Sequence, residues 1–245
     1  MKLVTTDAIV LRSYNLAEAD RIVVCLTRSV GLVRAVAKGA RRMKSRFGAA
    51  LEPFTLIRLS FHERENRDLV TISNAEILKS YFNLNSQVEA AELLAYMGEL
   101  VAEFAPPHEA DERLFRMLAA CIESLAETTG CERSIMRYFE VWLLRLAGLF
   151  PDLNACVECG RPLESIVEFD AEFRPYCGRC GRTGAASLSV STLASVRAAY
   201  RLAPAKFAEM EKLSERDDAQ LGDLTHRLIT RAIDRLPRTL MAANG

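Results

Sequence analysis

Short apolar runs separated by polar turns characterise the first 80 residues of the chain. Five of these runs have the length and the alternation of β-strands. They span residues 7–12, 21–26, 32–37, 54–59 and 69–72, with turn signals at 29–31 and 65–68. Five short strands in so few residues favour a small closed barrel. A β-sandwich is the alternative, but five strands are few for a sandwich.

The hydrophobic period becomes helical after residue 87. Apolar residues recur at helical spacing in segments 89–104, 111–130, 133–149, 191–202 and 218–236. Pro106 and Pro107 end the first segment. Trp142, the only tryptophan, lies on the third, where core packing and an aromatic groove for a partner peptide are the two interpretations. The pattern predicts an α+β chain in which helices follow a β-barrel.

Four of the seven cysteines form two Cys-x-x-Cys pairs separated by 17 residues. The pairs are Cys156 with Cys159 and Cys177 with Cys180. Tetrahedral Zn²⁺ binds two such pairs, and four thiolates leave no coordination position for water. We therefore expect one structural Zn²⁺ in a ribbon whose strand spans 166–169, with positive φ angles at Gly160, Gly178 and Gly181. Metal-free thiols or a redox dithiol are the alternative.

Signatures of catalysis are missing from the sequence. The Pro-Cys-x-x-Cys element of zinc deaminases is interrupted, because Tyr176 separates Pro175 from Cys177, and no histidine begins a His-x-Glu motif. The chain also contains no Gly-x-x-x-x-Gly-Lys-Ser/Thr string. We predict that the protein is not an enzyme and has no small-molecule substrate.

The formal net charge of zero conceals a strong asymmetry along the chain. Residues 1–60 contain eleven Lys and Arg against four Asp and Glu, whereas residues 61–130 contain five against thirteen. Five cations and no acid lie within 38–48, and Arg34 precedes them. The candidate phosphate-binding residues are therefore Arg34, Lys38, Arg41, Arg42, Lys44 and Arg46.

Two further features accompany this basic loop. Aromatic residues near it, which are core candidates or stacking surfaces for unpaired bases, are Phe47, Phe54, Phe61 and Tyr14. On the last helical segment Arg227, Arg231 and Arg235 recur every four residues. That spacing forms one stripe, which is either a solvated helix face or a second phosphate contact.

These motifs carry a resemblance to a known family. The chain resembles the bacterial RecO recombination mediators most closely over residues 31–42, and then through 44–46 and 51–56. The Cys-x-x-Cys pairs agree in place with zinc-bearing members. The resemblance implies an N-terminal five-stranded OB-fold barrel and a helical domain with an inserted Cys₄ zinc ribbon. We divide the chain accordingly into 1–80 (barrel), 81–150 (first helices), 151–185 (ribbon) and 186–245 (C-terminal helices packing on the helical domain).

The resemblance also implies a function in DNA repair. Members of the family bind single- and double-stranded DNA and anneal complementary strands. With RecR they load RecA onto DNA coated by single-strand-binding protein (SSB), whose C-terminal tail binds the helical domain. Since the sequence contains neither a run of 18 apolar residues nor a signal peptide, we expect a cytoplasmic, nucleoid-associated protein with no membrane partner. The competing hypothesis is a zinc-ribbon adaptor or transcription regulator whose barrel binds protein.

Overall fold

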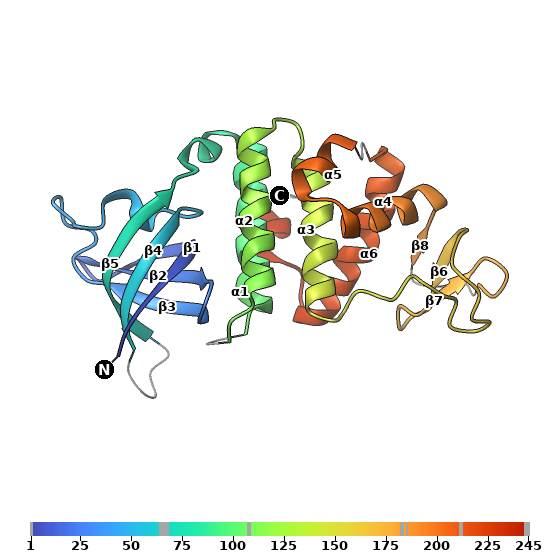
Figure 1. Ribbon diagram of the computed structural model, residues 1–245, viewed down its shortest axis with the longest axis horizontal. Helices are drawn as coiled ribbons and strands as arrows, with labels where there is room; N and C mark the ends of the chain where they lie inside the picture. Colours follow the sequence, from blue (N-terminus) through green and yellow to red (C-terminus); the bar gives the residue numbers. More distant parts are fainter. Residues whose placement is uncertain are drawn as a thin grey trace. The chain divides into compact units, whose positions relative to one another are not determined.

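The N-terminal part of the chain folds into a five-stranded barrel (Figure 1). The structure, a computed structural model, describes residues 2–63, 69–106, 109–181, 184, 186–210 and 213–242. The strands are β1 (Lys2–Leu16), β2 (Asp20–Thr27), β3 (Gly31–Ala37), β4 (Leu56–Glu63) and β5 (Leu69–Lys79). They close in the order β1-β2-β3-β5-β4, and only the β3–β5 pairing is parallel.

This closed Greek-key arrangement is that of an OB-fold. It confirms the predicted barrel and shows that the sandwich alternative is wrong. Most strands extend beyond the predicted apolar runs, because their ends continue the ladder with mainly exposed residues, which an apolar pattern does not mark. The turn predicted at 65–68 lies outside the described residues, as does Pro107.

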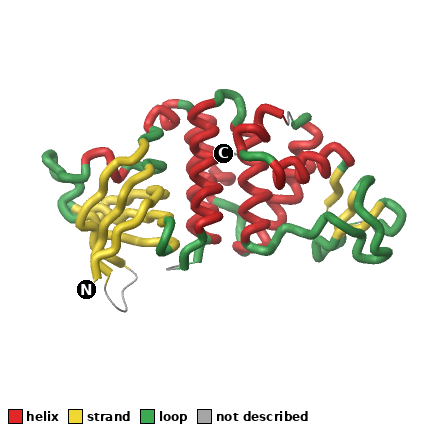
Figure 2. Tube along the Cα trace, viewed as in Figure 1, coloured by secondary structure: helices red, strands yellow, loops and turns green. Residues whose placement is uncertain are grey.

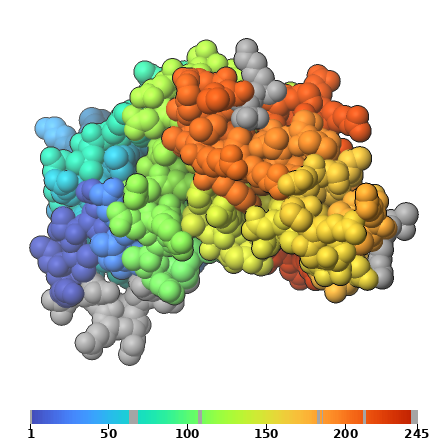
Figure 3. Space-filling view, turned by 45° about the vertical axis from the view of Figure 1, so that its right-hand side comes forward, coloured from blue at the N-terminus to red at the C-terminus, as the bar shows by residue number. Residues whose placement is uncertain are grey.

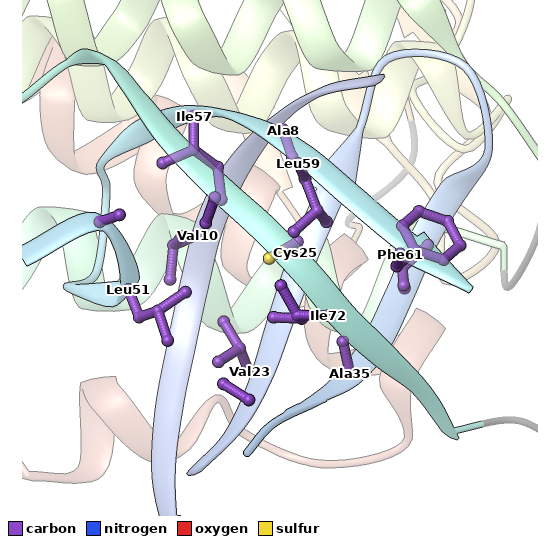
Figure 4. Packing of buried hydrophobic residues seen from close by; sticks show 14 of the residues in the cluster. Ala8, Val10, Val23, Cys25, Ala35, Leu51, Ile57, Leu59, Phe61 and Ile72 are labelled. Carbon is purple, nitrogen blue, oxygen red and sulfur yellow. The ribbon is translucent and has the colours of Figure 1, made fainter. Parts of the chain in front are cut away.

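The core of the barrel is built from the alternate residues that point inward. Figure 4 shows Val10 and Ala8 of β1 meeting Cys25 of β2 and Leu59 of β4 in one apolar cluster. A short 3₁₀ helix, η1 (Gly48–Leu51), adds Leu51 to this core. Burial raises the pKa of the Cys25 thiol to about 12, so this cysteine behaves as a small apolar residue.

A 3₁₀ turn, seven α-helices and a second small sheet follow in the described part of the chain (Figure 2). They are η2 (Phe82–Ser86, a 3₁₀ turn), α1 (Val88–Phe104), α2 (Glu112–Glu127), α3 (Glu132–Leu146), α4 (Val190–Arg201), α5 (Pro204–Met210), α6 (Glu215–Ile233) and α7 (Arg238–Ala242). The sheet contains β6 (Val167–Phe169), β7 (Pro175–Cys177) and β8 (Ala186–Leu188) in the order β7-β6-β8. Helices α5 and α7 were not predicted.

The chain forms two compact units. The first contains residues 1–126 and 237–245, and in it α1 packs on the outer faces of β1 and β2. Gly98 permits this close packing, since a Cβ there would lie 3.0 Å from the ring of Phe54. The second unit contains residues 127–236, and Figure 3 shows its cysteine-bearing segment, in yellow, beside the orange helices. The division into four segments bounded at residues 80, 150 and 185 remains a prediction.

No helix in the described ranges combines the length and the apolar character that crossing a membrane requires.

Candidate nucleic-acid interface and metal centre

The basic loop begins where β3 ends and is tied to the turn between β1 and β2. Gly39 has a positive φ of 71°, and its N–H donates a hydrogen bond to Asp20 Oδ1 at 2.8 Å. The Arg41 N–H donates to the Ala19 carbonyl at 2.9 Å, and the Arg41 guanidinium donates to the Ala17 carbonyl at 2.7 Å. The β1–β2 loop is one of the loops through which OB-folds bind oligonucleotides. The basic loop therefore lies beside a usual ligand-binding position of this fold.

The other end of the loop is anchored in the barrel. Phe47 is buried in the core, and the Arg46 guanidinium lies 4.8 Å from the centroid of its ring. The same guanidinium donates to the Ile72 carbonyl at 3.4 Å. In Figure 1 the loop projects from the left end of the barrel, in light blue. Both ends are thus fixed while the middle extends into solvent.

The cations of this surface are exposed and lack carboxylate partners. Across the described ranges no ion pair involves the six predicted DNA-binding residues, Arg34, Lys38, Arg41, Arg42, Lys44 and Arg46, and all six are exposed. Other cations of the barrel do pair, for example Arg21 with Glu52 at 3.0 Å. Positive charge is therefore left available at the loop.

The aromatic residues near the loop divide into two groups. Phe47, Phe54 and Phe61 are buried, which agrees with the interpretation that they belong to the core and leaves none of the three exposed for stacking with bases. Tyr14 is 48% exposed on β1 and remains available for stacking. Phe54 also lies outside its predicted strand: β4 starts at Leu56, and Phe54 adopts a φ of 62° in the preceding turn.

Met43, at the tip of the loop, is the residue that sequence reasoning missed. Its exposed fraction is 101%, the largest among the large apolar side chains in the described part of the chain. An apolar residue is expected inside a protein, and only the structure places this one among cations in solvent.

The predicted arginine stripe on the last long helix is incomplete. Helix α6 ends at Ile233 because Asp234 adopts a left-handed φ of 55°, so Arg235 lies beyond the helix. Arg227 pairs with Asp223 at 2.8 Å, and the Arg231 guanidinium donates to the Ala171 carbonyl. The expectation of one continuous three-residue stripe is therefore wrong. The involvement of these arginines in DNA binding remains a prediction.

Trp142 belongs to the packing between α3 and α4. Its indole N–H donates to the Ala199 carbonyl at 2.8 Å, and its ring meets Tyr200 edge-on at 6.2 Å. The side chain is half-buried, which agrees with the core-packing interpretation.

The four clustered cysteines converge on one point. Their sulfur atoms all lie within 4.8 Å of one another, and Cys159 Sγ is 3.9 Å from Cys177 Sγ. A Zn–S bond of about 2.3 Å in a tetrahedron places sulfurs about 3.8 Å apart. The residues therefore fit a four-coordinate metal ion, and this geometry leaves no position for a reacting water.

Backbone N–H groups lower the pKa of two of the clustered cysteines and so favour the thiolate form that binds metal ions. Burial by itself raises the pKa of Cys156, but the N–H groups of Cys159, Cys177 and Glu158 outweigh burial and lower this pKa to about 6. The N–H groups of Cys180 and Arg179 lower the pKa of Cys177. The Cys180 thiol is held protonated by its hydrogen bond with Cys159, and this bond, with burial and the charge of the adjacent thiolates, raises the pKa of Cys180 to about 12. The hydrogen bonds favour thiolates at Cys156 and Cys177, but a bound cation is needed to keep all four cysteines deprotonated.

The two Cys-x-x-Cys turns, Cys156–Cys159 and Cys177–Cys180, are the knuckles of the ribbon, and fewer of their glycines have a positive φ than predicted. Gly160 has the expected positive φ, 69°, and its N–H donates to the Cys156 carbonyl. Gly178 and Gly181 do not adopt positive φ, so that prediction is wrong for both. In the second Cys-x-x-Cys pair the turn is closed by the hydrogen bond from the Cys180 N–H to the Cys177 carbonyl, without a glycine of positive φ.

An OB-fold barrel with an exposed, unpaired basic loop beside its β1–β2 turn is typical of nucleic-acid-binding proteins. The four-thiolate cluster in a separate unit adds a candidate structural metal centre rather than an active site.

Comparison with known proteins identifies the family. Residues 1–81 match the family model for the N-terminal part of recombination protein O, and residues 86–241 match the model for its C-terminal part. The chain belongs to the RecO family of DNA repair and recombination proteins.

Individual relatives agree with this assignment. The chain is 36% identical to the DNA repair protein RecO of Anaeromyxobacter dehalogenans (strain 2CP-C) over 200 residues, which cover 80% of this chain and 78% of the relative. It is 31% identical to that of Alkaliphilus metalliredigens over 212 residues, covering 86% and 85%. It is 35% identical to that of Koribacter versatilis over 164 residues, covering 67% and 66%.

Proposed function

We propose that this protein is a recombination mediator that binds single- and double-stranded DNA and has no enzymatic active site. The observation that carries the proposal is the loop of exposed cations, which have no carboxylate partners among the described residues and lie beside the β1–β2 turn. Backbone phosphates would be neutralised there, and released counterions would supply much of the affinity. The family membership supports a role for this binding in DNA repair.

Strand annealing follows from the same chemistry. Two complementary strands repel each other through their phosphates, and a cationic surface that binds both reduces this repulsion while raising their local concentration. Base pairing then supplies the specificity. No covalent bond is made or broken, so the proposed acceleration needs no general acid, base or nucleophile.

Family membership supports the proposed partners. We propose that the protein acts with RecR to load RecA onto SSB-coated single strands, and that the SSB C-terminal tail binds its helical part. A cytoplasmic location at the nucleoid accompanies this function. Arg227, Arg231 and Arg235 are a proposed second DNA contact, weaker than the loop because Arg227 is already paired with Asp223.

The metal of the cysteine cluster is proposed to be one structural Zn²⁺, held by Cys156, Cys159, Cys177 and Cys180. Four sulfur ligands with tetrahedral spacing favour zinc over hard cations such as Mg²⁺. The ion would stabilise the ribbon by cross-linking its two knuckles.

A salt titration of oligonucleotide binding tests the DNA-binding proposal. Replacing Arg41, Arg42 and Lys44 together by Ala should weaken binding to all sequences alike. It should also reduce the log–log salt slope by about two units, since each phosphate contact on single-stranded DNA contributes about 0.7.

The matched control is the triple replacement of Arg28, Arg58 and Arg113 by Ala. It removes the same charge from exposed residues that pair with carboxylates, so the salt slope should stay nearly unchanged. Annealing of SSB-coated complementary strands should slow in the loop variant and not in the control. An unchanged slope in the loop variant would refute the loop assignment and favour the protein-binding adaptor.

A further inference from the structure

The tip of the basic loop carries an apolar side chain that electrostatic binding does not explain. Met43 is 101% exposed, whereas the large apolar side chain with the next highest exposure in the described ranges, Val88, is 72% exposed. Each of its neighbours, Arg42 and Lys44, is a cation. If the loop bound only phosphates, any polar residue would be sufficient at this position, and it would avoid the free-energy cost of exposing apolar surface to water.

Backbone hydrogen bonds fix the turn in which Met43 lies. The Arg42 N–H donates to the Gly39 carbonyl at 3.1 Å, and the Ser45 N–H donates to the Arg42 carbonyl at 2.9 Å. The second bond closes a turn in which Met43 and Lys44 are the two central residues. Below this turn, Ala40 packs against the barrel core. The side chain is thus presented outward from an ordered turn before any partner binds.

The charge around Met43 indicates the partner. Within three residues of it lie Arg41, Arg42, Lys44 and Arg46, and none forms an ion pair with another described residue. A partner that satisfies both features has a densely anionic exterior and an apolar interior that a thin side chain can enter. DNA has both, since its phosphates flank a stack of bases. Methionine is unbranched and polarisable, and it is one of the apolar wedges that DNA-bending proteins insert between bases.

We propose that Met43 inserts between adjacent bases while the cations beside it bind the flanking phosphates. This inference rests on the proposed DNA-binding function and adds a binding mode to it. Insertion would unstack one base step, which prepares a strand to exchange its stacking neighbours during annealing. The wedge also gives the loop a contact with bases that salt does not screen.

Fluorescence of 2-aminopurine tests the proposal, because this base brightens when it loses a stacking neighbour. Single-stranded oligonucleotides with one 2-aminopurine should brighten on binding the full-length protein. Met43→Ser should abolish the increase and weaken binding about tenfold at every salt concentration, as expected for losing the burial of one Met side chain. Its salt slope should equal that of the unaltered protein, because no phosphate contact is lost.

Two matched variants complete the design. Met43→Leu retains an apolar wedge and should restore most of the fluorescence change, whereas Val88→Ser removes an exposed apolar side chain from α1 and should change nothing. Thermal melting checks that all variants are folded.

The outcomes separate this inference from the function on which it rests. If the Arg41, Arg42 and Lys44 variant loses salt slope while Met43→Ser binds and brightens as the unaltered protein does, insertion is wrong and the basic loop stands. If neither variant affects DNA binding, both proposals fail. If Met43→Ser leaves DNA binding intact but abolishes binding to a protein partner, Met43 is a protein contact and the inference is overturned.

Discussion

At the scale of single residues, Glu140 of the second unit is a carboxylate with no exposed surface, so neighbouring groups must compensate its charge. It accepts hydrogen bonds from Arg137 at 2.7 Å and from Thr225 at 2.7 Å, and His226 Nε2 lies 3.1 Å away. Gly222 makes room for the guanidinium, because a Cβ there would lie 2.7 Å from its Cζ atom. Burial opposes ionisation of Glu140, but the charge of Arg137, together with the interactions with His226 and Thr225, outweighs burial and lowers the pKa of Glu140 to about 2. The α3–α6 contact therefore depends on a compensated buried charge.

Glu140→Gln should lower the free energy of unfolding by about 3 kcal/mol at pH 7, because it leaves the Arg137 guanidinium without its nearest buried carboxylate. The pKa of Glu140 is lower folded than unfolded, so its stabilisation is complete above the unfolded value of 4.5 and is lost as the pH falls toward 2. Urea denaturation at pH 7 and pH 3 should therefore show a smaller loss for the variant at pH 3. Glu209→Gln, in an exposed pair with Lys206, is the control and should have almost no effect.

At the scale of elements, the strands of the ribbon are too short for backbone pairing alone to stabilise it. Its strands β6, β7 and β8 are three residues long, and strands of this length with few cross-strand pairs are marginal in water. A backbone hydrogen bond from the Val157 N–H to the Pro175 carbonyl, 3.1 Å long, links the first Cys-x-x-Cys pair to β7. We therefore expect a metal ion in the cysteine cluster to contribute much of the stability of the ribbon.

We expect one tightly bound zinc ion per chain by metal analysis. Cys177→Ser should abolish stoichiometric zinc and lower the melting temperature, and strong chelators should do the same to the unaltered protein, because metal binding is coupled to folding. DNA affinity should change little, since the loop lies in the other unit. Cys131→Ser, at a cysteine outside the cluster, should retain the zinc. Two disulfides and no metal in a reduced preparation would contradict the assignment.

At the scale of the whole molecule, the C-terminus of the chain belongs to the first unit. After the second unit ends at residue 236, the N–H groups of Arg238 and Thr239 donate to the buried carboxylate of Glu99 on α1, each at 2.9 Å. The Thr239 hydroxyl adds a third bond to the same carboxylate at 2.8 Å. Residues more than 130 positions apart thus stabilise one another in the first unit.

Truncation after Leu236 should destabilise the first unit by about 2 kcal/mol, because it removes three donors from a buried carboxylate. Hydrogen exchange should show faster exchange in α1, while α3 and α6 of the second unit keep their protection. Removing only residues 243–245 leaves these bonds in place and should have no such effect. Equal loss of protection in both units would show that the C-terminal segment does not act on the first unit specifically.

By itself, the sequence determined the features that depend on local pattern. Strand alternation and helical period identified the barrel and the five longer helices, and the spacing of Cys156, Cys159, Cys177 and Cys180 identified a cluster that the structure brings together. The order of cations in 38–46 identified the basic loop. Each of these signals lies within one segment of the sequence, where side-chain type and spacing decide the outcome.

Only the tertiary structure decided which side chains are buried, paired or free. Phe47 and Met43 lie four residues apart in one loop, yet Phe47 enters the core and Met43 stays in solvent. The left-handed turn at Asp234 carries Arg235 out of the helix, and Glu99 meets residues that no local pattern associates with it. Burial and pairing depend on which distant segments cover a residue. That is a property of the packed chain, and a linear pattern of apolar and polar positions does not contain it.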